Sequence, residues 1–225
     1  MHIPQDGIIV APSMLCADFR HLAADVERLE QSGADWLHFD VMDGHFVPNL
    51  TYGPIVLEAV RPLTKLYFDA HLMISNPEDH VEAFAKAGAD LIVFHVEAAN
   101  NAPALAAEIR ELGCDVGVAI NPETPLDAVE PLLGAVDMIL VMGVHPGRAG
   151  QSYIPETTDR IRRLAEHFAD LGGGPAIAVD GGIKPPRVAE LYPLGARIFV
   201  SGSFVFDHPG GYAEAVRELR DAARG

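Results

Sequence analysis

An imidazole and a carboxylate stand two positions apart in the segment 36–44, which reads W-L-H-F-D-V-M-D-G. Apolar residues alternate with these polar ones, and the alternation predicts a strand that carries His38 and Asp40 on one face. Imidazole and carboxylate groups are common ligands of divalent transition metal ions, and a strand would hold both rigidly. The segment predicts either a metal-binding strand or a half-buried strand whose histidine and aspartate bond only to each other.

The elements that would position these groups alternate between strand-like and helix-like along the chain. Helical patterns are expected at 18–31, 54–61, from 76 onward, 103–112, 125–133, 156–170, 185–192 and 211–223. Short apolar strands are expected at 8–12, 36–40, 66–72, 91–95, 116–120, 137–142, 176–180 and 198–201. Eight strands that are each followed by a helix require a parallel sheet, and eight units can close it. We therefore expect an α/β fold of the (β/α)8 TIM-barrel class, as one domain over 1–225. An open doubly wound sheet is the alternative, and the count of eight disfavours it.

Composition and charge restrict the class of protein. The 225 residues carry a formal net charge of -16, which argues against binding to nucleic acid or to an anionic membrane surface. The stretch 1–10 lacks a basic region, and no segment approaches the roughly 20 apolar residues that a membrane helix needs. The two cysteines, Cys16 and Cys114, are scattered, which fits a reducing compartment better than a disulfide. We expect a soluble, cytoplasmic protein.

Polar side chains gather where the expected strands end, which is the edge at which barrels place their active sites. Two histidines and two aspartates, His38, Asp40, His71 and Asp180, form a mixed nitrogen and oxygen set. Such a set suits Zn, Mn, Fe or Co and leaves room for two substrate oxygens. A single histidine is more often a hydrogen-bonded core residue, but four such groups at one edge favour a site for one divalent metal ion.

Asp40 and Asp180 come from the second and seventh expected strands, on different sides of a closed barrel. Two carboxylates that face each other across a substrate suit a reaction that removes a proton from one face of a carbon and returns a proton to the other. A metal bound to the adjacent carbonyl and hydroxyl oxygens would stabilise the enediolate formed between the two transfers. Without the metal candidates, an aspartate followed by two glycines would be read as an ordinary turn.

Three glycine-containing loops follow the last three expected strands. Backbone N–H groups at such glycines can approach an anion closely, and barrels often bind phosphate after strands seven and eight. The candidate phosphate-binding residues are Gly147, Arg148, Ala149, Gly150, Gly181, Gly182, Gly202 and Ser203. Ordinary turns explain each loop separately but explain three adjacent loops less well. Arg148 either adds charge to this site or is a solvated surface residue.

Methionines stand at the ends of three expected strands, as Met42, Met73 and Met142. Methionine is usually a flexible filler of apolar cores. Three at the mouth of one pocket could instead form a dry lining that shields a reactive intermediate from water. The sequence leaves both interpretations open.

These residues also carry a family resemblance that covers nearly the whole chain. The matching runs are A-P-S at 11–13 with A-D-F at 17–19, H-F-D-V-M-D-G-H-F-V-P at 38–48, H-L-M at 71–73, N-P at 121–122, P-G at 146–147 with G-Q-S at 150–152, D-G-G at 180–182 and G-S at 202–203. With these runs the chain resembles the ribulose-phosphate 3-epimerases. The run D-V-M-D-G-H-F-V-P is highly specific, whereas the glycine pairs are weak singly.

The resemblance implies a (β/α)8 barrel that interconverts D-ribulose 5-phosphate and D-xylulose 5-phosphate, an isomerase of the pentose phosphate pathway. By motif match, His38, Asp40, His71 and Asp180 would hold one divalent metal ion, and the two aspartates would be the paired acid and base. Ser13 and His71 would touch the substrate, the glycine loops would hold its phosphate, and the three methionines would shield the intermediate. Family members are often oligomers, which implies a homo-oligomer. Its ligand would be a small sugar phosphate, with neither nucleic acid nor membrane as a partner.

The loop at 146–151 departs from the family pattern P-G-F-G-G-Q, because Arg148 and Ala149 replace its phenylalanine and its first paired glycine. Gly143 also stands where serine or threonine is common. These changes lie beside the expected phosphate site, so D-allulose-6-phosphate 3-epimerase, which acts on a longer ketose phosphate, is the alternative. A related decarboxylating barrel would carry a D-x-K-x-x-D run, but Met42 stands at the lysine position. A non-enzymatic barrel is disfavoured by the intact acid pair.

Overall fold

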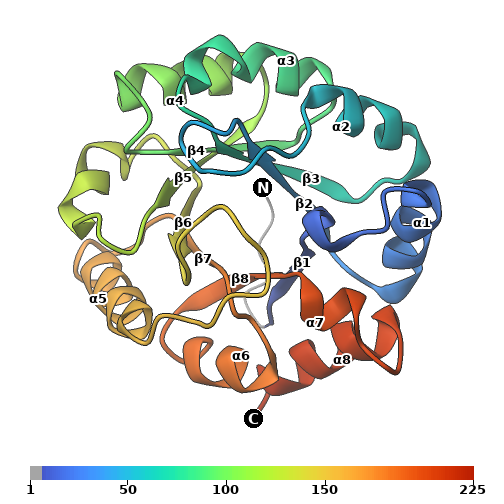
Figure 1. Cartoon of the computed structure of the whole chain (residues 1–225). Helices are drawn as coiled ribbons and strands as arrows, with labels where there is room; N and C mark the ends of the chain where they lie inside the picture. Colours follow the sequence, from blue (N-terminus) through green and yellow to red (C-terminus); the bar gives the residue numbers. More distant parts are fainter. Residues whose placement is uncertain (1–6) are drawn as a thin grey trace.

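Residues 7–225 are described by the computed structural model, and they form a barrel of eight parallel strands surrounded by helices (Figure 1). The strands are β1 (Ile9–Pro12), β2 (Trp36–Met42), β3 (Tyr67–Met73), β4 (Leu91–His95), β5 (Asp115–Ile120), β6 (Met138–Met142), β7 (Ala176–Asp180) and β8 (Ala196–Ser201). They pair in the order β1-β8-β7-β6-β5-β4-β3-β2. Residues 1–6 lie outside the described residues. The expected lack of a targeting signal and the expected start of the domain therefore stay predictions.

Contacts between β1 and β2 close the barrel. Ser13 and His38 form an isolated parallel bridge there, and the Asp35 N–H donates to the Val10 carbonyl oxygen at 3.1 Å. The other neighbouring strands pair in parallel around the sheet. The predicted (β/α)8 barrel is therefore confirmed, and the alternative of an open doubly wound sheet is wrong.

The strands separate two apolar layers, because successive side chains of a strand point to opposite faces. On β2, Leu37, Phe39 and Val41 belong to the larger cluster, which includes the buried residues of the outer helices. A second cluster fills the inside of the barrel. His38 and Asp40 alternate with the outward residues, so they point into the barrel, and both are buried.

The helices cover the outside of the barrel (Figure 1). The α-helices are α1 (Leu22–Ser32), α2 (Pro54–Val60), α3 (Val81–Lys86), α4 (Ala102–Glu111), α5 (Glu156–Asp170), α6 (Pro185–Leu191), α7 (Ser203–Phe206) and α8 (Tyr212–Ala222). Short 3-10 helices also occur, namely η1 (Met14–Cys16), η2 (Arg61–Leu63), η3 (Pro77–Asp79) and η4 (Leu126–Leu132). The predicted bounds 156–170 match α5, and the predicted strands 91–95 and 176–180 match β4 and β7.

Three helical segments differ from the predictions for local reasons. α1 begins at Leu22 rather than at residue 18, because the Asp18 carboxylate accepts a hydrogen bond from the Arg20 N–H at 3.1 Å, and such local bonds compete with a helix. The segment expected at 125–133 is a 3-10 helix in which Pro131 lacks the N–H that an α-helix would use. α7 was not predicted, because four residues are too few for a periodic pattern.

Three aspartates at the amino-terminal end of the barrel share one arrangement. Each stands directly before a strand, accepts a backbone N–H from the neighbouring strand and binds an arginine from an outer helix, with N···O distances of 2.7 to 2.9 Å. The groups are Asp35 with Val10 and Arg220, Asp90 with Phe68 and Arg61, and Asp137 with Val116 and Arg110. We call Asp35, Asp90 and Asp137 the amino-terminal rim aspartates.

The helices among residues 7–225 are all too short or too polar to cross a membrane. Cys16 and Cys114 are free thiols in different parts of the barrel. Cys16 lies beside the cavity described below, and Cys114 is buried just before β5.

Candidate metal centre and active site

Four of the predicted residues meet at the carboxyl-terminal end of the barrel. His38 and Asp40 come from β2, His71 comes from β3, and Asp180 comes from the end of β7. One ligand atom of each lies within 4.8 Å of the ligand atoms of the other three. A single ion could therefore contact all four groups.

Two buried imidazole nitrogens in this group, His38 Nε2 and His71 Nδ1, have no hydrogen-bond partner among the described residues. They lie 3.4 Å and 3.6 Å from Asp40 Oδ1, and each is 4.0 Å from Asp180 Oδ2. A buried polar atom without a partner costs free energy, and a coordinated cation would satisfy both nitrogens and both carboxylates. The donor set fits a divalent transition metal ion.

The second nitrogen of each imidazole is bonded to a group farther from the centre. His38 Nδ1 lies 2.6 Å from Asp69 Oδ2, and His71 Nε2 lies 2.9 Å from His95 Nε2. Such outer bonds fix the ring orientation and the tautomer of a metal-binding histidine. Sequence reasoning assigned no role to Asp69 or His95. A signal for Asp69 was present, because it stands two positions before His71 and pairs in register with His38.

Burial and charge push the pKa values of the two carboxyl groups apart. Burial disfavours ionisation of Asp40, but the nearby imidazoles of His38 and His71 outweigh it and hold the pKa of Asp40 well below its usual range. Burial, reinforced by the charge of Asp40, raises the pKa of Asp180 to about 7. Burial also lowers the pKa of His71, whereas at His38 burial is outweighed by Asp69 and Asp40, which raise its pKa. Separated carboxyl pKa values are typical of a pair in which one group is the acid and the other the base.

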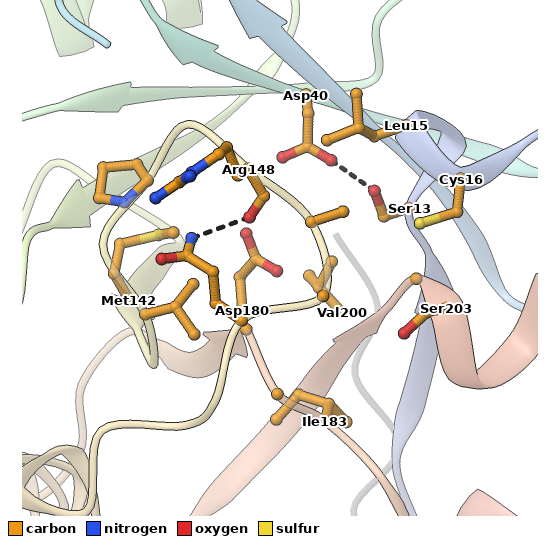
Figure 2. A pocket seen from close by; sticks show the side chains of 18 of the residues that line it. Ser13, Leu15, Cys16, Asp40, Met142, Arg148, Asp180, Ile183, Val200 and Ser203 are labelled. Carbon is orange, nitrogen blue, oxygen red and sulfur yellow. Dashed lines mark hydrogen bonds between the residues drawn. The ribbon is translucent and has the colours of Figure 1, made fainter. Parts of the chain in front are cut away.

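A cavity of about 480 Å³ lies beside this group. Asp40 and Asp180 line it from different sides, with the Asp180 carboxyl group pointing toward Asp40 (Figure 2). Ser13 also lines the cavity, and its hydroxyl donates a hydrogen bond to Asp40 Oδ2. His38 and His71 are fully buried and do not line it. The carboxyl groups, rather than the imidazoles, therefore face a molecule in this cavity.

The predicted phosphate-binding residues line another side of the same cavity. They are Gly147, Arg148, Ala149, Gly150, Gly181, Gly182, Gly202 and Ser203. Gly181 and Gly182 have φ angles of +106° and +68°, and an added Cβ would lie 2.5 Å from Val144 Cγ2 and 2.8 Å from Tyr153 Cβ, respectively. Conformation and space both require glycine at these two positions, so the loop after β7 presents bare backbone to the cavity.

Close packing explains the glycine at position 143. Its N–H donates to the Asp180 carbonyl oxygen at 2.6 Å. An added Cβ would lie 2.7 Å from the Gly181 carbonyl oxygen. A larger residue would require the loop after β7 to move. The close contact between the loops after β6 and β7 therefore requires glycine at position 143.

Two basic residues that the sequence analysis did not select also line the cavity, Lys184 and Arg187. Lys184 directly precedes α6, and the Arg187 guanidinium lies 3.8 Å from the centre of the Tyr153 ring. Their sequence signal was weak, because they stand two and five positions after the D-G-G run and the path of a loop cannot be read from spacing. They add positive charge to a chain that is strongly acidic as a whole.

The three predicted methionines, Met42, Met73 and Met142, line the cavity and are almost fully buried. Met42 and Met73 pack with Val47, whereas Met142 packs with the cluster inside the barrel. The three methionines therefore pack in apolar clusters and also form part of the cavity wall. The shielding of an intermediate stays a prediction.

Comparison with known proteins assigns the chain to a family. The sequence profile of the Ribulose-phosphate 3 epimerase family matches residues 9–206. A ribulose-phosphate 3-epimerase from Synechocystis sp. is 50% identical over 221 residues, which cover 97% of this chain and 95% of that protein. The chain belongs to the ribulose-phosphate 3-epimerase family. The ribulose-phosphate 3-epimerase of Escherichia coli, 41% identical over 94% of each chain, agrees. The predicted resemblance is confirmed, and the chain is an isomerase of the epimerase type.

Solved structures of other barrels share only the fold with this member of the ribulose-phosphate 3-epimerase family. KGPDC from Streptococcus mutans superposes with a TM-score of 0.71 at 14% identity, covering 97% of this chain and 98% of that one. Phosphoribosyl anthranilate isomerase from Thermus thermophilus superposes with a TM-score of 0.66 at 20% identity, covering 96% and 98%. At such identities the likeness shows a common barrel and nothing about chemistry.

Proposed function

We propose that the chain interconverts D-ribulose 5-phosphate and D-xylulose 5-phosphate by moving a proton at C3 with the help of one divalent metal ion. The pairing of Asp40 and Asp180 carries the proposal. These two carboxyl groups have opposed pKa shifts and line one cavity, beside two buried imidazole nitrogens that lack partners. Epimerisation needs one group to take a proton from one face of a carbon and another to return a proton to the opposite face.

The side chains around the carboxyl pair support this chemistry. In each direction one of Asp40 and Asp180 accepts the C3 proton as a carboxylate and the other donates as a carboxylic acid. Ser13 bonds to Asp40 and would keep that carboxylate oriented toward the substrate. A divalent ion held by His38, Asp40, His71 and Asp180 would supply positive charge that stabilises the negative charge developed when the proton leaves.

The rest of the cavity would hold the substrate in place. The loops after β6, β7 and β8 would bind the phosphate through backbone N–H groups, since Gly181 and Gly182 leave their backbone uncovered. Arg148, Ala149 and the neighbouring Gly147, Gly150, Gly202 and Ser203 would complete that site. The buried methionines beside the carboxyl groups would exclude water from the reacting carbon.

The test follows the proton and the metal together. Purified protein is loaded with Zn, Mn, Fe or Co and incubated with D-ribulose 5-phosphate in D2O, and NMR measures deuterium at C3 of substrate and product. We expect product that carries deuterium at C3, loss of turnover on chelation, and recovery when the metal is returned. Absence of both product and exchange with every metal would contradict the proposal.

D-Allulose 6-phosphate is the second candidate substrate, and the loop after β6 favours considering it. Arg148 and Ala149 line the cavity where the family pattern has phenylalanine and glycine, so the far end of the pocket differs from that pattern. The longer ketose places its phosphate one carbon farther from C3. Parallel measurements of kcat/KM on both phosphates decide, and a higher value for the hexulose phosphate would replace the pentulose phosphate as substrate.

Two further expectations stay predictions. A homo-oligomer is checked by the mass of the purified protein in analytical ultracentrifugation. A cytoplasmic location is checked by fractionating cells that express the chain. Neither outcome changes the chemistry proposed for the cavity.

A further inference from the structure

His95, at the end of β4, is fully buried between the candidate metal ligand His71 and the side chain of Glu97. We propose that His95 and Glu97 are positioning residues that fix the tautomer of His71, so that its Nδ1 presents a lone pair to the metal ion. The inference rests on the proposed metal site and adds two residues to it. Neither residue lines the cavity, so any effect on metal binding must act through His71.

The direction of the hydrogen bonds is set at Glu97. Its Oε1 accepts from the Asn121 backbone N–H at 2.7 Å and from the Thr124 hydroxyl. Its Oε2 lies 3.1 Å from His95 Nδ1. Burial opposes ionisation, but hydrogen bonds from His95, Thr124 and Asn121 lower the pKa of Glu97 to about 2. The side chain is therefore a carboxylate, which has no proton to donate, and His95 Nδ1 must carry the hydrogen of that bond.

The proton on His95 Nδ1 determines which nitrogen is protonated in His95 and then in His71. A neutral imidazole carries one N–H, so His95, protonated on Nδ1, offers its Nε2 as an acceptor. His95 Nε2 lies 2.9 Å from His71 Nε2, and one of these two nitrogens must donate. His71 Nε2 is therefore the donor, and its other nitrogen, Nδ1, keeps a lone pair. This Nδ1 is the nitrogen that faces Asp40 and has no hydrogen-bond partner among the described residues.

Packing holds the His71 and His95 rings in place. The His71 and His95 rings stack with their centres 5.0 Å apart, and the Phe46 ring lies 4.7 Å from the centre of His95 on another side. The Val96 N–H, directly after His95, donates to the Ala119 carbonyl oxygen at 3.0 Å. Because the rings are fixed, a change of proton order cannot be relieved by rotation of His95 into solvent.

Replacement of Glu97 by glutamine tests the proton order with almost no change in shape. The amide oxygen of Glu97→Gln must face the Asn121 N–H and the Thr124 hydroxyl, so its NH2 group faces His95 Nδ1. His95 Nδ1 would then have to accept, His95 Nε2 would donate, and the proton of His71 would move to Nδ1, where the metal binds. We expect zinc affinity to fall about 10- to 100-fold, the usual effect of losing such an outer partner.

The measurement is a zinc titration of the metal-free protein in competition with a chromophoric chelator. Glu130→Gln is the matched control, because Glu130 pairs with His167 at 2.8 Å on the outside of the barrel. Wild type and Glu130→Gln should bind zinc equally, and Glu97→Gln should bind it more weakly while keeping the circular dichroism spectrum of the wild type. Equal affinity in all three proteins would overturn the role of Glu97.

A second measurement needs no variant. Nitrogen-15 NMR of the histidine rings in metal-free wild type reports which nitrogen of each ring carries the proton. We expect His71 and His95 protonated on Nε2 and Nδ1, respectively, and the opposite order would overturn the inference even if Glu97→Gln failed to fold. Failure of the wild type to bind zinc, manganese, iron or cobalt is a distinct result, which would remove the metal site of the proposed function and this role with it.

Discussion

The aspartates at the two ends of the barrel differ in what surrounds their carboxylates. The amino-terminal rim aspartates, Asp35, Asp90 and Asp137, each bind an arginine and a backbone N–H. At the carboxyl-terminal end, Asp40 and Asp180 face imidazoles and each other, and no arginine or lysine among residues 7–225 forms an ion pair with them. The half-exposed carboxylates at the amino-terminal end are neutralised by arginines within the fold, whereas Asp40 and Asp180 at the other end are not.

This difference separates structural aspartates from reactive ones. A carboxylate that binds an arginine and a backbone N–H has its charge balanced by the fold itself, so it stabilises one geometry. Carboxyl groups held beside one another in a buried site have shifted pKa values and leave neighbouring nitrogens without partners, which a cation and a substrate would satisfy. The partners of each carboxylate therefore predict its role better than the fact of its being an aspartate.

Replacing one aspartate at each end of the barrel by asparagine should give the largest difference in kcat. We expect Asp180→Asn to lower kcat about 100- to 10,000-fold, because the amide can neither accept nor donate the C3 proton as an acid or base. Asp90→Asn, at the amino-terminal rim, should leave kcat unchanged. Steady-state turnover of D-ribulose 5-phosphate with metal-loaded proteins measures both. Asp40→Asn should resemble Asp180→Asn.

The same turnover assay can contradict the distinction between structural and reactive aspartates. Circular dichroism confirms that each asparagine variant folds before its turnover is interpreted. Near-normal turnover in Asp180→Asn would remove that carboxyl group from the proposed acid and base pair. A large loss of kcat in well-folded Asp90→Asn would show that the amino-terminal rim contributes to chemistry after all.

Removing Arg61, at the amino-terminal end of the barrel, should reduce stability and leave turnover unchanged. Its guanidinium binds Asp90 at 2.9 Å, donates to the carbonyl oxygens of Thr64 and Leu66 at 2.8 Å and 2.7 Å, and lies 3.6 Å from the centre of the Phe68 ring. We expect Arg61→Ala to lower the free energy of unfolding by about 2 to 3 kcal/mol, because several hydrogen bonds from one charged group are lost together. Urea denaturation measures the loss, and kcat should not change.

The control for Arg61 is an arginine with a single exposed partner. Arg217 pairs with Glu214 one turn away on α8, and both side chains are exposed. Arg217→Ala should cost less than about 1 kcal/mol, as exposed ion pairs usually do. Equal losses in the two variants would mean that the rim arginines are no more than surface charges.

The reactive end was more predictable from sequence than its supporting residues. His38, Asp40 and His71 lie on the polar face of apolar strands and Asp180 ends another, so alternation and strand order already placed them in the barrel interior, and the family motifs selected the same four residues. The contact between His71 and His95 depends on the register between β3 and β4 in the closed barrel. The order of the strands along the sequence does not give that register.

Other elements had no periodic signal or a misleading one. α7 is four residues long, so nothing in the sequence distinguished it from a loop. Lys184 reaches the cavity because of the path taken by the loop after β7, and loop paths depend on packing rather than on composition. η4 was expected as an α-helix because its apolar pattern is helical, but Pro131 changed the type of its hydrogen bonds.

Asp43 tests whether partners or location decide the role of an aspartate. It stands at the carboxyl-terminal end, three residues after Asp40, but its oxygens accept hydrogen bonds from Ser75, His45 and Phe46, each at 2.8 Å. Burial opposes ionisation, but these bonds lower the pKa of Asp43 from 3.8 to about 2. Its partners predict a structural role despite its position.

The pH dependence of stability measures that role. Because the folded pKa lies below the usual value, ionised Asp43 stabilises the fold above about pH 4, and this contribution is lost as the pH falls toward about 2. We expect Asp43→Asn to cost about 1 kcal/mol near neutral pH, after allowance for solvent screening. Urea denaturation should show the difference from wild type shrinking below about pH 4. A difference that stays constant with pH would assign the effect to packing.

Arg148 should give the smallest effect, because it is exposed at the reactive end. It lines the cavity, and its carbonyl oxygen accepts a hydrogen bond from Gln151 Nε2 at 2.8 Å (Figure 2). Arg148→Ala keeps this backbone bond and removes the guanidinium together with the side chain that carries it. We expect KM for the sugar phosphate to rise by up to about fivefold, the range of an exposed ion pair, with kcat unchanged. High salt should abolish the difference, whereas a fall in kcat would place the guanidinium near the reacting carbon and extend the chemistry of this end beyond its carboxyl groups.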